Sequence, residues 1–311
     1  MATVPSLVLR PRLAPARRPW AGGQLGDGIG ELWLAGPESI VDTPERAITL
    51  DELAEDLGET LVGRRGMRRL GRRFPLLVKL IDAGDWLSLQ VHPSDELARR
   101  RHGPSAVGKA EAWVVLASVP GAVLITGPRP GLCAAEMREH IANGTLGRGE
   151  CLDRPAMPGD VLYLPSGTVH AIGAGVLVYE IEQPSDLTYR ISDWGRPAVP
   201  GRRLHRDEAL EAARPEQCAL LRGQAWQLDA EGLAAPEFAL EILGPGPTQW
   251  RDPRGETPEV VSVAGGAAML VGDDWAEPLG PGEAIVVAAA SHGYRIEAEP
   301  GTRVLVGSLP A

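Results

Sequence analysis

Leu87-Ser88-Leu89-Gln90-Val91-His92-Pro93 carries the pattern from which both the fold and a candidate site are predicted. Side chains alternate along a β-strand, so Ser88, Gln90 and His92 share one face and the apolar side chains share the other. A hydroxyl, an amide and an imidazole that face inward are costly unless something binds them. The alternative is a half-buried antiparallel strand whose polar face meets water. Other segments of the chain decide between the two.

The composition is that of a globular protein and narrows the classes of partner. The chain has 311 residues, of which 44% are hydrophobic and 23% charged, enough for two domains. The formal net charge of −10 argues against nucleic acid, and no apolar run is long enough to predict a membrane span. The first ten residues lack the apolar core of a signal peptide, and the three cysteines lack metal-ligand spacing. We therefore expect a cytoplasmic protein with reduced thiols.

Only two of the 31 basic residues are lysine, and both flank the opening strand. A lysine ammonium is compact and mobile where the arginine guanidinium is a planar fork, so a tight site can require lysine. Lys79 interrupts an apolar run over 74–82, which predicts a strand buried on both sides. Lys109 opens the next strand and shares a face with Glu111 and Trp113. The alternative is that both lysines occur at these positions by chance.

Helix and turn signals separate the strands. Leucines at helical spacing, with acidic residues near the start, predict a helix over 49–70. Shorter helices are predicted over 132–146 and 207–213. The strands on either side of Pro120-Gly121 are expected to form a hairpin around that turn.

A second pattern begins at the turn Pro158-Gly159-Asp160. A strand over 161–164 follows, then Pro165-Ser-Gly-Thr-Val-His170, then a strand over 176–182. This order resembles the second half of the cupin signature, in which a jelly-roll barrel presents metal ligands inside its mouth.

The last third of the chain weakly repeats this plan. The segment that begins at Glu259 echoes the one that begins at Glu111, and the turn and strand that follow it are echoed too. The second copy lacks a Gln-x-His strand, and His292 is expected to be structural. The predicted fold is mainly β, with two jelly-roll (cupin) barrels. We predict a catalytic domain over 1–204 with helical insertions, and a smaller domain without a metal site over 205–311.

Four side chains can converge on a metal ion if their strands line one barrel: Gln90, His92, Glu111 and His170. Two imidazoles, a carboxylate and an amide oxygen suit Zn²⁺, with Fe²⁺ and Mn²⁺ not excluded. One carboxylate leaves a divalent ion net positive, so it would still polarise substrate oxygens. Each residue alone is more often structural, but together, in cupin order, they predict a metal site.

Five segments in order resemble type I mannose-6-phosphate isomerase (phosphomannose isomerase) in its short bacterial form. They are Phe74–Leu80, Leu87–Pro93, Gly108–Trp113, Pro165–Gly173 and Ser185–Arg196. The resemblance implies a cytoplasmic enzyme of carbohydrate metabolism that interconverts mannose 6-phosphate and fructose 6-phosphate. It also implies one zinc ion per chain, held by the four residues named above.

The resemblance assigns further roles to single residues. It implies an essential arginine at Arg190, and phosphate-binding and proton-transfer groups among Lys79, Ser88 and Lys109. The lysine segment that longer members carry after the arginine is absent, which leaves Arg196 as a substitute. Near the start, the family's Trp-Gly-Gly is replaced by Trp20-Ala-Gly-Gly23.

We expect the reaction to move a proton between C1 and C2 of the open-chain sugar phosphate through an enediolate. Negative charge grows on oxygen in that step, and the metal and Arg190 would stabilise it. Lys109 is a candidate acid or base, because a nearby metal ion would lower its pKa. Glu180 is the competing candidate base.

Two other classes of function remain open. A cupin dioxygenase would more often use a His-rich ligand set on iron and has no need of two lysines and an arginine at the mouth. A non-catalytic sugar-phosphate-binding protein is the other alternative. The expected partner is a small sugar phosphate rather than nucleic acid or a membrane, and the chain is expected to be a monomer or a homodimer.

Overall fold

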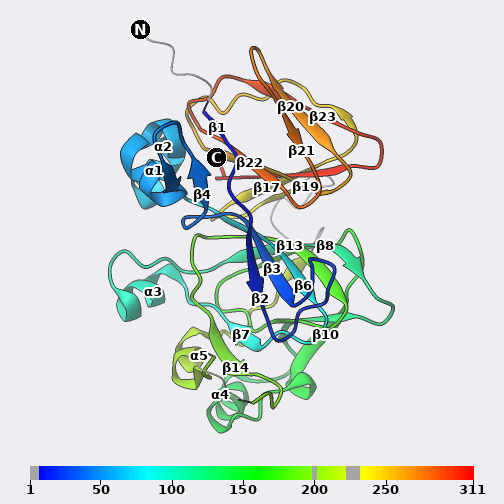
Figure 1. Ribbon diagram of the computed structural model, residues 1–311. Helices are drawn as coiled ribbons and strands as arrows, with labels where there is room; N and C mark the ends of the chain where they lie inside the picture. The colour runs from blue at the N-terminus through cyan, green and yellow to red at the C-terminus, as the bar shows by residue number, and fades with distance from the viewer. Residues whose placement is uncertain (1–6, 198–201, 222–231) are drawn as a thin grey trace. The chain divides into compact units, whose positions relative to one another are not determined.

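The structure is a computed structural model that describes residues 7–197, 202–221 and 232–311, and it is mainly β, as predicted (Figure 1). In the described part of the chain the helices are α1 (Leu50–Leu57), α2 (Glu59–Leu70), α3 (Asp95–His102), α4 (Ala134–Asn143) and α5 (Arg206–Ala212), with a 3₁₀ turn at Arg148–Glu150. No helix among these residues is both long and apolar enough to cross a membrane.

Three sheets carry the predicted site residues or directly adjoin them. The largest has the order β15 (Leu220–Leu221), β11 (Val161–Leu164), β8 (Glu111–Ser118), β13 (Val176–Glu182), β6 (Leu77–Ala83), β3 (Ile29–Ala35) and β2 (Ala14–Arg17). A second has the order β10 (Cys151–Pro155), β9 (Val123–Pro128) and β12 (Ala171–Ile172). The third pairs β14 (Tyr189–Ser192) with β7 (Leu89–Val91).

Three further sheets complete the structure. One has the order β1 (Val8–Leu9), β22 (Ala284–Val287), β19 (Glu259–Gly265), β24 (Arg303–Ser308), β17 (Ala239–Leu243) and β16 (Gly232–Ala234). Another has the order β18 (Gly246–Pro247), β23 (Tyr294–Ala298), β20 (Ala268–Gly272) and β21 (Ala276–Leu279). The last pairs β4 (Ile40–Asp42) with β5 (Ala47–Thr49). These sheets establish a mainly β fold, and the finer description as two jelly-roll barrels is part of the proposal below.

The chain divides into two compact units, each built from separated segments. Residues 16–31, 81–197 and 202–221 form the central unit. Residues 7–15, 32–80 and 232–311 form the C-terminal unit. The N-terminal part of the chain thus contributes to both units, and the predicted domains of 1–204 and 205–311 stay a prediction.

The helix predicted over 49–70 is present but interrupted. Thr49 caps α1 in a capping box, in which its side chain accepts from the Glu52 amide and Glu52 accepts from the Thr49 amide. Gly58 then separates α1 from α2 with a φ of +53°, and Gly63 inside α2 has a φ of +72°. These values favour glycine over residues with a Cβ, so the two glycines account for the breaks that leucine spacing alone did not predict.

The hairpin predicted around Pro120-Gly121 is wrong. β8 pairs with β11 and β13, whereas β9 pairs with β10 and β12. The turn, closed by a hydrogen bond from Ala122 N to Val119 O at 3.1 Å, therefore carries the chain from one sheet to another. Turn residues predict a reversal of direction, but the pairing of the two strands depends on neighbours distant in the sequence.

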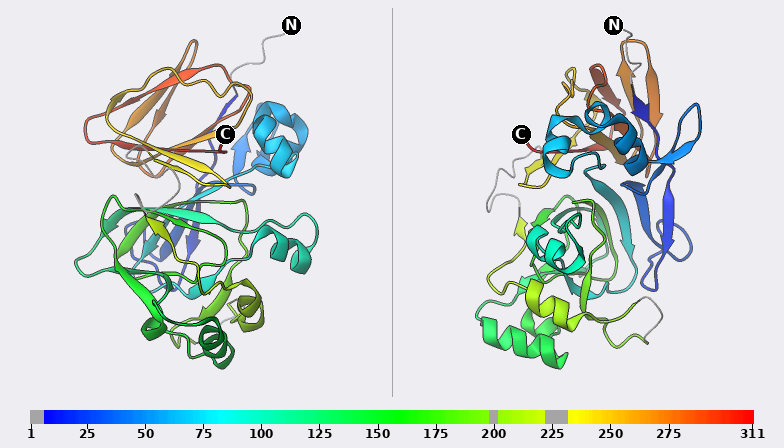
Figure 2. Two further views of the ribbon diagram at one scale, coloured as in Figure 1. Left: turned by 180° about the vertical axis from the view of Figure 1, so that it is seen from behind. Right: turned by 90° about the vertical axis from the view of Figure 1, so that its left-hand side faces the viewer.

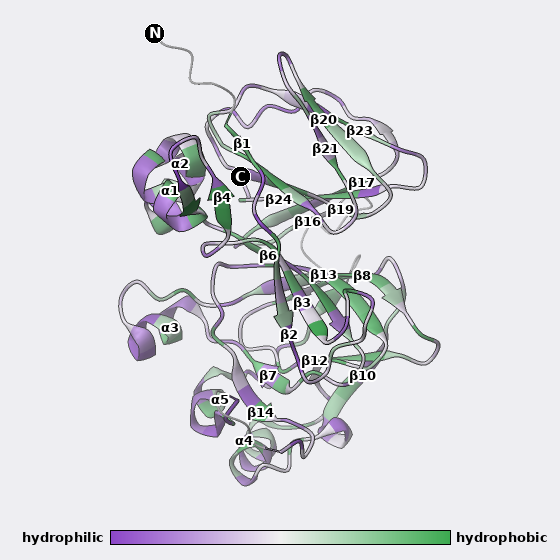
Figure 3. Ribbon diagram, viewed as in Figure 1, coloured by the Kyte–Doolittle hydropathy of each residue, from purple (hydrophilic) through white to green (hydrophobic). Residues whose placement is uncertain are grey.

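The predicted helices over 132–146 and 207–213 are confirmed as α4 and α5. The two helices pack together and lie next to each other near β14 (Figures 1 and 2). Their apolar residues, such as Met137, Ile141 and Ala209, join a buried cluster with Leu89 and Ile191 of the paired strands β7 and β14. Hydrophobic and hydrophilic residues alternate along these helices (Figure 3). This cluster covers the apolar face of β7, the strand that carries Gln90.

The C-terminal unit repeats the strand pairing of the central unit. Glu111 at the start of β8 lies opposite Leu164, the last residue of β11. Glu259 at the start of β19 lies opposite Val287, the last residue of β22. The match in register supports the internal repeat predicted from the sequence. The side chain of His292 is exposed.

Candidate metal centre

Gln90 lies where three segments of the central unit meet. It is in β7 and lies opposite Arg190 of β14. It also forms an isolated antiparallel bridge with His170, in which Gln90 N donates to His170 O at 3.0 Å and His170 N donates to Gln90 O at 2.9 Å. The backbone thereby brings three of the residues predicted from the sequence to one place.

His92, Glu111 and His170 form a buried cluster. Glu111 Oε2 is 3.2 Å from His92 Nε2, and Glu111 Oε1 is 3.2 Å from His170 Nε2. The centroids of the two imidazole rings are 4.8 Å apart, and all three side chains are buried. One ligand atom from each of the three lies within 4.8 Å of the others, so the group could hold a metal ion.

Backbone carbonyls fix the orientation of both imidazoles. His92 Nδ1 donates to Leu187 O at 2.8 Å, and His170 Nδ1 donates to Thr168 O at 2.9 Å. A carbonyl can only accept, so the proton of each neutral ring is on Nδ1 and the lone pair on Nε2 points into the cluster. This arrangement is typical of histidines that ligate metal ions.

The acceptor atoms of the cluster favour a cation between them. Glu111 Oε1 is buried without a hydrogen-bond donor, and its neighbour His170 Nε2 is also an acceptor. Burial lowers the pKa of His170, and burial and the Lys109 ammonium lower that of His92 to about 3, so both rings are neutral. Acceptors that face one another in a buried site repel unless a cation lies between them. Nitrogen and oxygen donors of this kind suit zinc.

The Gln90 amide can complete the donor set. Its Nε2 is 3.2 Å from His170 Nε2 and 3.4 Å from His92 Nε2, while its Oε1 accepts from Ser88 Oγ at 3.0 Å. The oxygen and nitrogen of an amide exchange places on a half-turn about the last side-chain bond. That half-turn would point the oxygen into the cluster and leave Ser88 Oγ as acceptor for the amide N–H.

Lys109 is buried against two carboxylates. Its Nζ is 2.7 Å from Glu111 Oε2, 2.6 Å from Glu182 Oε2 and 3.3 Å from His92 Nε2. Burial by itself would lower the pKa of Lys109, but attraction by Glu111, Glu182 and Glu180 outweighs it and holds that pKa well above its usual value. The lowered pKa of Lys109 that we expected from the sequence took account of the charge of a metal ion but not of these carboxylates. A metal ion at the donor set would act against the carboxylates and lower the pKa of Lys109.

Glu180 and Glu182 both point to the cluster, and each has a partner. Glu180 Oε1 accepts from Trp113 Nε1 at 2.9 Å, and Glu182 lies directly opposite Glu111 where β13 pairs with β8. Glu182 was not among the predicted site residues. Its place on the same strand face as Glu180, two residues on, was the sequence signal that could have found it.

Arg190 is half-buried beside the donor set, and its Nε has no hydrogen-bond partner among the described residues. Burial, together with repulsion from Arg202, lowers its pKa. Arg196 has a different environment, because its guanidinium donates to Asp193, Asp85 and the Trp86 carbonyl. Both arginines have a buried Nε without an acceptor among the described residues. They differ in that Arg196 forms ion pairs with Asp85 and Asp193.

Lys79, the other predicted phosphate-binding residue, belongs to the C-terminal unit. It lies in β6, is buried, and its Nζ is 4.7 Å from the centroid of the Trp33 ring, which is a cation–π distance. Its predicted role in phosphate binding stays a prediction.

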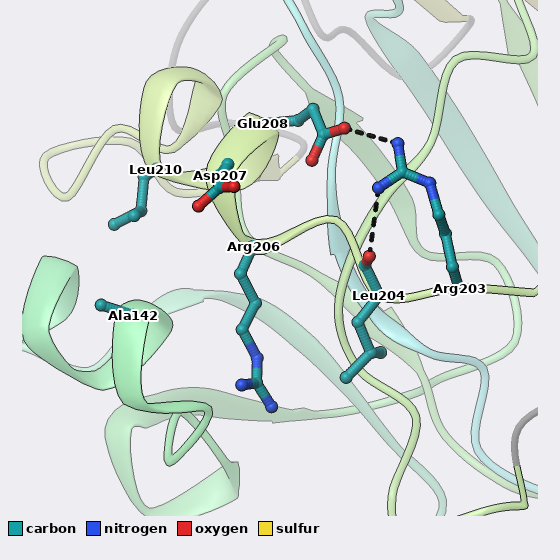
Figure 4. A pocket seen from close by; sticks show the side chains of 7 residues that line it. All are labelled: Ala142, Arg203, Leu204, Arg206, Asp207, Glu208 and Leu210. Atoms are coloured by element: carbon teal, nitrogen blue, oxygen red, sulfur yellow. Dashed lines mark hydrogen bonds and ion pairs between the residues drawn. The ribbon is translucent and has the colours of Figure 1, made fainter.

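A hollow of about 490 Å³ between α4 and α5 is separate from the donor set (Figure 4). It is lined by Ala142, Arg203, Leu204, Arg206, Asp207, Glu208 and Leu210. Arg203 Nη2 forms an ion pair with Glu208 Oε1 at 2.6 Å across it. None of the residues predicted from the sequence lines this hollow.

Comparison with known proteins agrees with this geometry. Residues 25–109 match the family model described as phosphomannose isomerase type I, catalytic domain. The mannose-6-phosphate isomerase of Streptococcus mutans is 34% identical over 209 residues, which cover 62% of this chain and 63% of that protein. A probable mannose-6-phosphate isomerase of Bacillus subtilis, GmuF, is 37% identical over 210 residues, covering 62% and 64%. The matched region thus spans slightly less than two thirds of these relatives.

Solved structures extend the similarity along the chain. The crystal structure of mannose 6-phosphate isomerase from Bacillus subtilis superposes with a TM-score of 0.80 at 26% identity, covering 97% of this chain and 99% of that one. A mannose 6-phosphate isomerase crystallised with zinc bound superposes with a TM-score of 0.74 at 15% identity, covering 98% of this chain. That second likeness concerns the fold alone. The resemblance to type I phosphomannose isomerase inferred from the sequence is confirmed.

Proposed function

We propose that this chain is a type I phosphomannose isomerase, which interconverts mannose 6-phosphate and fructose 6-phosphate. The observation that carries the proposal is the buried donor set, in which two imidazoles with backbone-bonded Nδ1 atoms point their Nε2 atoms at Glu111. A set of this kind has no structural need to face inward unless it binds a cation.

The cation we propose is one zinc ion per chain, held by Gln90, His92, Glu111 and His170. Zinc with these ligands would supply Lewis-acid stabilisation of negative charge on the substrate oxygens. A solved relative is described as zinc-bound, which supports this choice of metal. This set of two imidazoles, a carboxylate and an amide oxygen also suits zinc, whereas dioxygenases more often hold iron with a His-rich set.

Arg190 would stabilise charge on the reacting part of the sugar. It lies opposite Gln90 across the paired strands β14 and β7 and has a buried N–H without an acceptor. A guanidinium donates charge-assisted hydrogen bonds to oxyanions, and such bonds strengthen as the enediolate develops. Arg190 would therefore bind the transition state more strongly than the ground state.

Lys109 is the group we favour for proton transfer between C1 and C2. Its Nζ is 2.6 Å from Glu182 Oε2, so the ammonium would pass a proton to this carboxylate, take the proton of C2 as a neutral amine and deliver it to C1. Glu180 remains the competing base, but its carboxylate already accepts a hydrogen bond from Trp113. In either case the proton removed from C2 of the aldose is delivered to C1, the hydroxyl proton of O2 passes to O1, and no external co-reactant is needed.

We assign phosphate binding to Lys79 and Ser88, and Ser88 Oγ lies next to the donor set through its hydrogen bond to Gln90. Arg196 would have to release Asp193 and Asp85 to reach a phosphate, so we assign it last.

We further propose the wider setting of this site. The catalytic domain would comprise 1–204 and the smaller domain 205–311, each a jelly-roll barrel, with the metal site in the first. The protein would act in the cytoplasm, as a monomer or homodimer, on a small sugar phosphate.

The test is conversion of fructose 6-phosphate to mannose 6-phosphate by the purified chain, before and after treatment with a chelator. We expect activity that chelation removes and Zn²⁺ restores. The variant His92→Ala should lose both zinc and activity, while the matched variant His292→Ala, at an exposed histidine, should keep both.

Other outcomes would favour the alternatives. A zinc-loaded chain that binds fructose 6-phosphate without turnover would favour a binding protein. Bound iron with consumption of oxygen would favour a dioxygenase. Either result would overturn the isomerase proposal.

A further inference from the structure

Residues 107–110, which include Lys109 and directly precede β8, form hydrogen bonds with two other segments of the chain. Lys109 N donates to Pro93 O at 3.0 Å, and Gly108 N donates to Asp95 Oδ1 at 2.8 Å. Ser185 Oγ donates to Val107 O at 2.9 Å. We call residues 107–110 the lysine segment, because their backbone sets the position from which the Lys109 side chain extends.

Gln183 joins these bonds into one network. Its Oε1 accepts from Ala110 N at 2.9 Å, and its own N donates to Ala110 O at 3.1 Å. Its Nε2 donates to Asp95 Oδ1 at 3.0 Å. Asp95 Oδ1 therefore accepts from both Gly108 and Gln183, and one carboxylate oxygen ties the lysine segment to the end of β13.

The lysine segment also packs directly on the turn that follows His92. A Cβ at Gly108 would lie 2.5 Å from Asp95 N, 2.6 Å from Ser94 C and 2.8 Å from Pro93 O. Real Cβ atoms do not approach backbone so closely, so only glycine permits this contact. A shift of the lysine segment must therefore move the turn that follows His92, or break the hydrogen bonds to Asp95.

We propose that Asp95 and Gln183 are positioning residues for proton transfer, joined as the Asp95–Gln183 clasp. The clasp sets the distance from Lys109 Nζ to Glu111 and His92. This inference rests on the proposed isomerase function, in which Lys109 moves the proton. A misplacement of about 1 Å in such a group costs on the order of 100-fold in rate.

The second carboxylate oxygen of Asp95 has a separate partner, which provides a control. Asp95 Oδ2 is 3.2 Å from Arg99 Nη2 in an exposed i,i+4 ion pair on α3. Arg99→Ala removes that pair and leaves the clasp intact, so it should keep wild-type activity.

The decisive variants are Gln183→Glu and the double variant Asp95→Asn/Gln183→Glu. The single change keeps an acceptor for Ala110 N but sets a carboxylate against Asp95, so the clasp opens. We expect kcat to fall about 10-fold to 100-fold, with KM for fructose 6-phosphate within about 2-fold and one zinc per chain retained. The double variant removes the repulsion between the two carboxylates, but an amide N–H that faces the new carboxylate no longer accepts from Gly108 N. We therefore expect it to recover part of the lost kcat.

Amide hydrogen exchange measures the clasp without the reaction. The peptide that contains Gly108 and Ala110 should exchange faster in Gln183→Glu and return towards wild type in the double variant. Because exchange does not depend on turnover, this result tests the clasp even if the chain proves not to be an isomerase. Asp95→Ala, which removes both bonds without adding charge, is the second variant if Gln183→Glu does not fold.

Three results would overturn the inference. The first is unchanged kcat in both Gln183→Glu and Asp95→Ala. The second is a loss of activity that only follows loss of zinc. The third is exchange at Gly108 and Ala110 that does not differ from wild type.

Discussion

Single residues of the donor set are fixed by contacts with backbone carbonyls. His92 and His170 each donate from Nδ1 to a carbonyl, which fixes the tautomer and points the other nitrogen at Glu111. Zinc bound there would have its ligands oriented before it arrives, so little rearrangement is needed on binding. Arg190, in contrast, lies beside this set with an N–H left over for another acceptor.

This difference predicts separate effects on rate and on metal binding. Arg190→Ala should lower kcat by about 100-fold to 1000-fold, because it removes a donor to the developing oxyanion. Zinc content should stay at the wild-type level, as measured by elemental analysis. The variant Arg99→Ala, at an exposed arginine of α3, is the control for loss of positive charge. Loss of zinc in Arg190→Ala would mean that Arg190 supports the metal site instead.

The three cysteines should differ sharply in reactivity. All three are free, with Cys133 exposed and Cys151 buried, and burial raises the pKa of the Cys151 thiol to about 12. Burial also raises the pKa of the half-buried Cys218. Because the thiolate is the reactive form, native protein treated with iodoacetamide at pH 8 should be labelled first at Cys133 and not at Cys151. Mass spectrometry would detect the order, and early labelling of Cys151 would contradict it.

Ion pairs stabilise the turn that follows β14. Asp193 accepts from Arg196 Nη2 and from Arg202 Nε, each at 2.7 Å. Trp194, the residue after Asp193, has a φ of +57°, an uncommon value for a residue with a Cβ. Trp194 Nε1 donates to Leu87 O at 2.5 Å, which ties the turn to the chain just before β7. The ion pairs and this bond together hold the turn in a conformation that its sequence does not favour.

The same ion pairs predict a pH dependence of stability. Burial by itself would raise the pKa of Asp193, but hydrogen bonds from Arg202 and Arg196 outweigh it and lower that pKa below the usual value. A carboxyl group with a lowered folded-state pKa stabilises the protein above about pH 4, and that contribution is lost as the pH falls through the lowered pKa. Asp193→Asn should cost about 1 kcal/mol at pH 7, after allowance for solvent screening, and lose less stability between pH 5 and pH 3. Denaturant titrations at several pH values would measure both, and parallel acid limbs would contradict the prediction.

Across the whole molecule, the two repeats place a glutamate at the same register position but surround it with different side chains. Glu111 faces two imidazoles and Lys109 in the central unit. Glu259, at the matching register in the C-terminal unit, forms an ion pair with Arg251 at 2.6 Å and accepts from Tyr294 Oη at 2.5 Å. In the C-terminal unit, the Arg251 guanidinium therefore neutralises the Glu259 carboxylate. In the central unit, the matching Glu111 carboxylate is surrounded by two histidines and the Lys109 ammonium.

Removal of metal should lower the stability of the protein. Chelation leaves the buried acceptors of the donor set facing one another, and binding to the folded state alone stabilises by about 2.7 kcal/mol at a free zinc concentration 100 times the Kd. The Tm should fall on treatment with a chelator and recover with Zn²⁺ but not with Mg²⁺, as measured by calorimetry. An unchanged Tm in protein verified to be free of zinc would contradict this.

The faces of the strands and the chemistry of the donor set follow from local sequence patterns. A period of two places Ser88, Gln90 and His92 on one face, because alternation is a local property of an extended backbone. The same alternation places Glu180 and Glu182 on one face of their strand. Residue types with the right affinities, in an order that resembles a known family, were enough to name the four candidate ligands and the mainly β fold.

Which strand faces meet depends instead on long-range pairing, which is visible in the three-dimensional structure. Strand pairing depends on hydrogen bonds between segments far apart in the chain, and local periodicity carries no information about the partner. For this reason the predicted hairpin was wrong and the position of Glu182 opposite Glu111 was missed. The same long-range pairing brings Gln90 beside His170 and Arg190, and it surrounds Lys109 with the carboxylates that hold its proton.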